Sequence, residues 1–399
     1  MCARSVIRSS KALHNRALGI TCVHSAARPS KSDETNLAPA NRAKSTRCAV
    51  CGTKPIRNKP PPWHNSKLLD ELEQLKRLSA KVGGDLTLTQ GAGGNTSLKR
   101  DGQLLVKASG KWLANACDEP MFLPVDLERV RRAIPVGHED PLAATPLVDT
   151  ALRASIETSF HALLPQRVVV HVHTVNTIAW AVQREWAKLI SPLLEGLNWR
   201  WVPYTRPGLS LTRLIAERLQ PGVNVWVLAN HGLIVAAETV AEAEALLGDV
   251  ERRLTIEPRR LPWDRQKLLT LCADRKWKLP KHEVAHQAAL GGARARFATE
   301  GSLYPDHTVF LGPACASFNE GLDKYRERWK MEPKAVVVEG AGLLLDAETS
   351  AGAEEMAACL GLVLERLDAS AEVAFLDQTE VYGLMNWDAE KYRQSITKN

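Results

Sequence analysis

Apolar side chains recur at helical spacing in two segments of the N-terminal half of the chain. From Ser66, a residue type that caps helix N-termini, leucines follow three or four positions apart until Gly83-Gly84 ends the pattern. This spacing predicts one amphipathic helix. A second helix is expected over residues 146–164, where Pro165 ends the run because its ring cannot continue a helix.

Short apolar runs between and after these segments predict strands. Residues 86–89 and 104–107 have a strand-like composition. The runs 167–173 and 223–229 are rich in valine and are bounded by turn residues or a change of period, so we expect two buried strands there. The alternation of strands and helices is consistent with an α/β fold.

An internal repeat is found when the chain is compared with itself at an offset of 110 residues. Residues 232–244 then align with residues 342–354, with eight of thirteen positions identical. Both copies have the pattern of a strand, a turn with Thr as the helix cap, and a helix, which indicates duplication of one unit. His231 has Ala341 as its counterpart, so residues from about 302 onward are expected to be a degenerate companion of the first copy.

The formal net charge of +7 is concentrated at the N-terminal end of the chain. Residues 1–62 hold twelve Lys or Arg against Asp33 and Glu34, so the remainder is slightly acidic and no nucleic-acid partner is expected. This segment has no sustained apolar period and is expected to be a disordered basic tail. Its composition fits an organelle transit peptide and equally an over-extended start of translation.

The remaining composition limits the compartment and the partners. No run of eighteen apolar residues occurs, so no membrane partner is expected. Four of the eight cysteines lie in the basic tail, and the other four have no recognisable spacing, which suits a reducing compartment. A cytoplasmic location is therefore expected, with organelle transit as the alternative.

Removal of the tail is expected to leave the protein intact. A chain that starts at Trp63 should keep its melting temperature and activity, because the composition of residues 1–62 cannot bury enough apolar surface to offset the entropy lost on ordering. Thermal unfolding of both chains checks this expectation. A clearly lower melting temperature in the shortened chain would show that the tail packs on the rest.

Three histidines at predicted strand ends indicate a metal site. In His171-Val172-His173 the two imidazoles are two positions apart on a strand, so they share a face. His231 follows the next valine-rich strand and precedes Gly232, which permits a tight turn. A single His is more often a core residue, but three in this arrangement favour a catalytic metal site with an open position.

Two further features carry candidate chemistry. Glu157 lies on the predicted helix before the His strand, where a carboxylate suits a general acid/base, although an exposed helix charge would look the same. The loop at residues 91–97 is rich in Gly and hydroxyl groups, which cradle phosphate or sugar oxygens in some proteins and mark only a turn in others.

Together these residues resemble the class II aldolase/adducin family over residues 66–255. The motifs are Gly94-Asn95-Thr96-Ser97, Ala108-Ser109-Gly110, Ser155-Ile156-Glu157, His171-Val172-His173, Tyr204 and Asn230-His231-Gly232. Segments 303–312 and 387–393 are similar to the aldolase half of bifunctional rhamnulose-1-phosphate aldolase/alcohol dehydrogenase proteins. The resemblance implies a three-layer α/β/α sandwich on a mixed, mostly antiparallel sheet, and we expect a smaller C-terminal α/β domain.

The resemblance also implies roles for individual residues. His171, His173 and His231 would bind zinc or another divalent metal, and Glu157 would be the catalytic acid/base. Tyr204 would donate a proton in a neighbouring subunit's site, which implies a homo-oligomer. The residues that would hold the substrate's phosphate or equivalent group are Gly94, Asn95, Ser109, Gly110 and Ser155. Ile156 stands where the family has a second Ser, which weakens the case for a phosphate unless Lys99 or Lys107 compensates.

These inferences combine into one expected organisation and activity. Residues 1–62 are the tail, 63–260 the catalytic domain, 261–301 a linker or helical segment, and 302–399 the companion domain. The expected activity is metal-dependent retro-aldol cleavage of a ketose phosphate or related sugar derivative through a metal-stabilised enediolate. Sugar-phosphate epimerisation, dehydration or decarboxylation on the same scaffold, and a non-catalytic binding module like the adducin head, are the alternatives.

Overall fold

A computed structural model describes residues 66–136, 144–273 and 276–396. All of these belong to one compact unit, residues 60–399. Within these ranges, no helix has the length and apolar character needed to cross a lipid bilayer. The tail expected at residues 1–62 lies outside the described residues, so its disorder stays a prediction.

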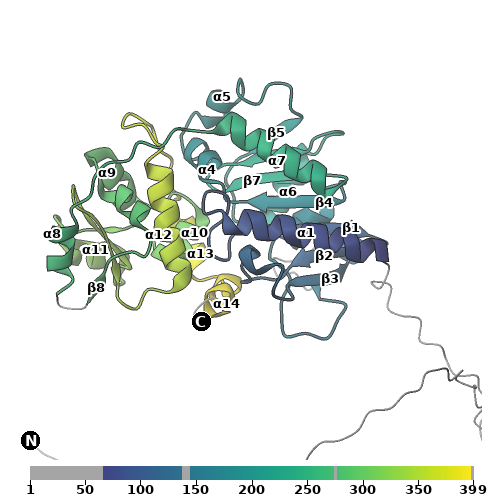
Figure 1. Ribbon diagram of the computed structural model, residues 1–399, viewed down its shortest axis with the longest axis horizontal. Coiled ribbons are helices and arrows are strands. Elements are labelled where there is room, and N and C mark those ends of the chain that lie inside the picture. Colours follow the sequence, from purple (N-terminus) through teal and green to yellow (C-terminus); the bar gives the residue numbers. More distant parts are fainter. Residues whose placement is uncertain (1–65, 137–143, 274–275, 397–399) are drawn as a thin grey trace, which may run out of the picture. The chain divides into compact units, whose positions relative to one another are not determined.

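A mixed sheet of seven strands forms the larger part of the fold (Figure 1). Its spatial order is β3-β2-β1-β4-β7-β6-β5, and only the β5–β6 pair is parallel. The strands are β1 (Asn95–Arg100), β2 (Gln103–Lys107), β3 (Phe122–Asp126), β4 (Val168–Val172), β5 (Trp199–Val202), β6 (Val225–Leu228) and β7 (Gly232–Ala237). The expected mixed, mostly antiparallel sheet is confirmed.

Helices cover both faces of this sheet and complete the three expected layers (Figure 1). On one face, α1 (Ser66–Gly84) and α7 (Val240–Leu254) bury leucines and valines against β1, β4, β6 and β7. The other face packs against α2 (Leu127–Ala133), α3 (Thr158–Leu163) and α6 (Leu209–Arg218). Side chains alternate along β4, where Val168, Val170 and Val172 join the first layer and Val169 the second, as a strand buried on both faces requires.

A second, smaller sheet lies in the C-terminal region, with the order β8-β11-β10-β9. Its strands are β8 (Trp277–Lys278), β9 (Ala316–Ser317), β10 (Ala335–Val338) and β11 (Gly342–Asp346). The helical elements of the C-terminal region are α8 (Arg265–Leu271), η4 (Glu283–Ala289), α9 (Gly292–Glu300), α10 (Pro305–Leu311), α11 (Leu322–Trp329), α12 (Ala351–Leu364), α13 (Gln378–Met385) and α14 (Asp388–Ile396). The remaining ones are η2 (Leu113–Asn115), α4 (Val175–Ala181) and α5 (Trp186–Ile190). Because β8 comes from segment 261–301, this sheet begins before residue 302, and the domain boundaries stay predictions.

The internal repeat extends to strand pairing. In the β6–β7 hairpin, Val225 pairs with Val235 and Leu228 pairs with Gly232. The corresponding pairs of the β10–β11 hairpin, 110 residues later, are Ala335–Leu345 and Val338–Gly342. A helix follows each hairpin. The expected Thr cap holds only in the first copy, where Thr239 caps α7, because Ser350 rather than Thr349 accepts the capping hydrogen bond of α12.

The helix expected over residues 146–164 is wrong for most of its length. Only α3 is helical, and the preceding residues run alongside the end of β2 instead. The Ser109 amide donates to the Arg153 carbonyl oxygen at 2.8 Å, and the Ser155 amide donates to that of Lys107 at 3.1 Å. Pairing with a distant segment therefore overrides the local apolar spacing. Glu157 is consequently the N-cap residue of α3 and not part of a helix face.

The strand expected over residues 86–89 is also wrong. The amides of Leu88 and Thr89 both donate to the carbonyl oxygen of Asp85, which closes a turn after α1. The sequence did not predict the neighbouring strand β1, because several of its buried residues are polar. With Thr96, Ser97 and Lys99 at buried positions, the segment lacks the alternation of apolar and polar residues that marks a strand.

A buried histidine in the C-terminal region predicts acid sensitivity. His307 is fully buried, which lowers its pKa to about 3, so below the ordinary value near 6.5 the unfolded chain binds a proton that the folded chain does not. Folding stability is therefore expected to fall as the pH decreases from 7 to 5. In His307→Asn the amide oxygen can still accept the Leu303 amide hydrogen bond.

Urea unfolding of the metal-free protein at both pH values checks this expectation. Between pH 7 and pH 5, the wild type should lose about 2 kcal/mol more of its unfolding free energy than His307→Asn. This follows because one proton bound only by the unfolded chain lowers the unfolding free energy by about 1.4 kcal/mol for each pH unit below 6.5. Equal losses in the two proteins would show that His307 titrates normally in the folded state.

Candidate active site

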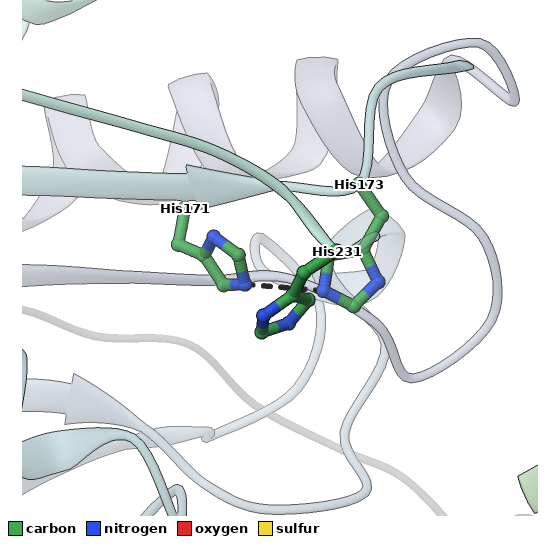
Figure 2. A group of neighbouring side chains, drawn as sticks. All are labelled: His171, His173 and His231. Atoms are coloured by element: carbon green, nitrogen blue, oxygen red, sulfur yellow. Dashed lines mark hydrogen bonds between the residues drawn. The ribbon is translucent and has the colours of Figure 1, made fainter. Parts of the chain in front are cut away.

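Three histidines converge at one end of the central sheet (Figure 2). His171 lies on β4 and His173 follows two positions later, so both side chains leave the same face of the strand. His231 enters from the turn between β6 and β7. A Cβ at Gly232 would lie 2.4 Å from the Val172 carbonyl oxygen, so this turn needs Gly. The three ring centroids are 4.9 to 5.0 Å apart.

Hydrogen bonds donated by Nδ1–H orient two of these rings. His171 Nδ1–H donates to the Leu233 carbonyl oxygen at 3.0 Å, and His173 Nδ1–H donates to Asp306 Oδ2 at 3.0 Å. The two Nε2 atoms then face each other at 3.1 Å, and their lone pairs are directed at each other (Figure 2). Lone pairs at this distance repel unless a cation or a proton lies between them, so the arrangement favours a bound cation.

The donor set fits a small divalent metal. One nitrogen from each His lies within 4.8 Å of the others. Tetrahedral zinc with bonds of about 2.0–2.1 Å separates its nitrogens by about 3.3 Å, so small side-chain movements would bring the three nitrogens to the distances that zinc requires. Burial lowers the pKa of His171 to about 4 and the pKa of His231 well below its ordinary value. Both rings are therefore neutral at pH 7, which is the form that binds metals.

Glu157 faces the histidines from the N-terminus of α3. Its Oε2 lies 3.4 Å from His171 Nε2, and its Oε1 lies 3.7 Å from His231 Nε2. Asn95 Nδ2 donates to Oε2 at 2.8 Å, whereas Oε1 has no hydrogen-bond partner among the described residues. One carboxylate oxygen is thus held by the protein, and the other is directed at the histidines and the pocket.

A chain of buried polar groups fixes this orientation of Glu157. The carboxylate only accepts, so the amide nitrogen of Asn95 faces it and the Asn95 carbonyl oxygen accepts from His161 Nε2–H. His161 Nδ1 then accepts from the Ser97 hydroxyl at 2.7 Å. Burial keeps the pKa of His161 low and the ring neutral, which this relay requires. His161 therefore helps to orient Glu157 through Asn95 and is not part of the three-His group.

A small pocket adjoins the histidines and Glu157. Its lining includes all five residues that the resemblance implies for substrate binding, namely Gly94, Asn95, Ser109, Gly110 and Ser155. Lys107 also lines it, and its Nζ donates to the carbonyl oxygens of Ala92 and Gly94 at 2.9 and 2.7 Å. Burial lowers the pKa of Lys107 to about 7. A group of oxygen and nitrogen donors therefore lies beside the metal candidates.

The three histidines and Glu157 lie within a segment that matches a known protein family. Residues 73–257 match the family model of the Class II Aldolase and Adducin N-terminal domain. This part of the chain is therefore similar to that domain. The uncharacterised oxidoreductase YuxG of Bacillus subtilis is 31% identical over 188 residues, which is 42% of this chain and 27% of that protein. The chain thus matches about a quarter of that relative's length.

Solved structures with similar folds include two described as aldolases. The N-terminal class II aldolase domain of a Thermoplasma acidophilum protein has 23% identity and a TM-score of 0.43, over 49% of this chain and 97% of that one. The L-fuculose-1-phosphate aldolase from Thermus thermophilus has 19% identity and a TM-score of 0.33, over 51% of this chain and 96% of that one.

Two residues suggested by the family resemblance lie away from the pocket. Tyr204 packs against the apolar core of the C-terminal region, and its buried hydroxyl has no hydrogen-bond partner among the described residues. Burial and nearby Glu380 raise the pKa of Tyr204. Its role in a neighbouring subunit's site stays a prediction. Lys99 donates to the Gln166 carbonyl oxygen, so Lys107 is the one of the two lysines that lines the pocket.

Three charged pocket residues come from outside the matched residues 73–257. Asp306 lies on α10, and Glu390 and Arg393 lie on α14, yet all three line the pocket. Sequence reasoning did not identify them as site residues. A signal was present, because Asp306 lies in segment 303–312 and the other two in segment 387–393, which were singled out only by their resemblance to bifunctional proteins.

Proposed function

We propose that the chain is a metal-dependent class II aldolase that cleaves a ketose phosphate or a related sugar derivative. The observation that carries this proposal is the group of three buried histidines that faces Glu157 beside the donor-lined pocket. Zinc or another divalent metal would be held by His171, His173 and His231. When bound, it supplies a Lewis acid that polarises adjacent substrate oxygens and stabilises the negative charge left when the carbon–carbon bond breaks.

The chain's own residues bind the substrate and move a proton. The hydroxyl groups of Ser109 and Ser155 and the backbone amide of Gly110 are the donors proposed for the substrate's terminal group. Glu157, held by Asn95 through one oxygen, has its second oxygen available to deliver a proton to the nucleophilic carbon after cleavage. In the direction of synthesis the same carboxylate removes that proton. Tyr204 of a neighbouring subunit is proposed to exchange the proton on the aldehyde oxygen.

The position of Lys107 favours a substrate that carries an anionic group. Ile156 supplies no hydroxyl at the position where the family has a second Ser, and the buried Lys107 side chain lines the same pocket. The positive charge of a lysine with a pKa of about 7 is favoured when an anion binds next to it. A phosphate on the ketose is therefore part of the proposal.

Product analysis on a panel of ketose 1-phosphates and sugar acids tests the reaction type. The aldolase proposal expects two carbonyl fragments from at least one ketose 1-phosphate. A product with the substrate's carbon count would assign epimerisation or dehydration instead, and release of carbon dioxide would assign decarboxylation. Absence of turnover on every member of the panel, with metal bound, would favour a binding module over an enzyme.

A further inference from the structure

One buried contact between the C-terminal region and the class II aldolase domain is made at a candidate metal ligand. Asp306, on the first turn of α10, accepts the Nδ1–H of His173 at 3.0 Å. Both side chains are buried, with exposed fractions of 4% and 7%. Residue 306 lies beyond residues 73–257, so a region outside the family domain completes the surroundings of one ligand.

Arg393 on α14 holds this aspartate in place. Its guanidinium is hydrogen-bonded to Asp306 Oδ1, so the two carboxylate oxygens are divided between Arg393 and His173. Arg393 Nε also pairs with Glu390 Oε2 at 2.7 Å. Arg393 thereby fixes the orientation in which Asp306 faces His173.

The loop before β1 leaves room for this pair. A Cβ at Gly93 would lie 2.8 Å from His173 Nδ1 and 3.1 Å from Asp306 Oδ2. The first distance is shorter than real Cβ contacts, so a side chain at this position would displace the hydrogen bond. The Gly-rich loop at residues 91–97, which the sequence links to substrate binding, thus also accommodates the contact between the two regions.

We infer that Asp306, held by Arg393, is a positioning residue that keeps His173 in the tautomer and orientation that present Nε2 to the metal. The inference rests on the proposed metal site. A carboxylate behind a ligand imidazole makes the opposite ring nitrogen a better donor, and the loss of such a partner typically weakens metal binding about 10- to 100-fold. Because α10 and α14 supply the pair, metal affinity depends on the folded C-terminal region.

Metal affinity of matched variants tests the inference. Asp306→Asn keeps the shape and an acceptor oxygen but removes the charge, and its zinc dissociation constant, measured by competition with a chromophoric chelator, should rise about 10- to 100-fold. Arg393→Met should raise it in the same direction. The double variant should bind zinc no more weakly than Asp306→Asn alone, because Arg393 acts through Asp306.

Glu365→Gln is the matched control. Glu365 is a fully buried carboxylate that pairs with Arg366 at 3.1 Å and Arg260 at 3.2 Å, and it does not line the pocket. This variant should lower the melting temperature while its zinc dissociation constant stays within about twofold of the wild type. An equal loss of affinity in Glu365→Gln, or unchanged affinity in Asp306→Asn, would overturn the inference. If the wild type itself binds no zinc, the proposed function fails instead.

A second measurement needs only the wild-type protein. Long-range proton–nitrogen NMR correlations of the zinc-loaded protein should show His173 with a protonated Nδ1 and a metal-bound Nε2. This signature does not depend on whether Asp306→Asn folds. Coordination of His173 through Nδ1 would leave Asp306 without its donor and would overturn the inference.

Discussion

A His171→Ala variant is expected to purify with far less than the single divalent metal per chain that we expect for the wild type, and to lose activity. The His171 ring supplies one of the three nitrogens of the metal-binding group found among the described residues, and its Nε2 lies 3.1 Å from that of His173. Two remaining imidazoles bind zinc much less tightly than a three-His site. Elemental analysis after dialysis, together with aldol cleavage assays, measures both losses.

A buried histidine outside the site provides the control for this variant. His286 stacks on Trp263, and its Nδ1 accepts the Leu343 amide. His286→Asn should lower the melting temperature while leaving metal content unchanged. Stoichiometric metal in His171→Ala would show that the three histidines are not the metal site.

Replacement of Glu157 by Gln is expected to lower kcat by about 10²- to 10⁴-fold, the usual range for a lost general acid/base. Gln preserves the size of the side chain, and its amide oxygen can still accept from Asn95 Nδ2, which lies 2.8 Å from Oε2. Proton transfer alone is removed. Metal content should fall much less than in His171→Ala because all three histidines remain.

Steady-state kinetics on metal-loaded protein measures this effect. Ser159→Ala is a matched control on the same helix, since its hydroxyl bonds Thr212 and does not line the pocket. That variant should retain kcat near the wild-type value. Near-normal turnover in Glu157→Gln with metal bound would show that another group moves the proton.

The sequence predicted the site more completely than it predicted the elements that carry it. The in-phase pair His171 and His173 could be inferred because strand periodicity is local. Glu157 was expected on a helix face, yet the structure places it at an N-cap, because residues 153–155 pair with residues 107–109. Such pairing between distant segments leaves no local pattern.

The residues from α10 and α14 could not be inferred from spacing. Asp306 lies 133 positions from His173, and Arg393 lies a further 87 positions along the chain. Neither residue has a pattern that distinguishes it from the many surface charges, although both side chains are buried. Only the three-dimensional arrangement shows that two late segments return to the pocket. The repeat, by contrast, was visible in sequence because duplication preserved both register and spacing.

Release of an aldehyde from a ketose 1-phosphate by zinc-loaded, chelator-treated and zinc-restored protein tests whether the three histidines hold a catalytic metal. We expect cleavage by the loaded protein, its loss after chelation and its recovery when zinc returns, with no inactivation by borohydride in the presence of substrate. Cleavage that persists after complete removal of metal, or that borohydride abolishes by trapping a lysine adduct, would contradict the assignment of His171, His173 and His231 as the catalytic metal site.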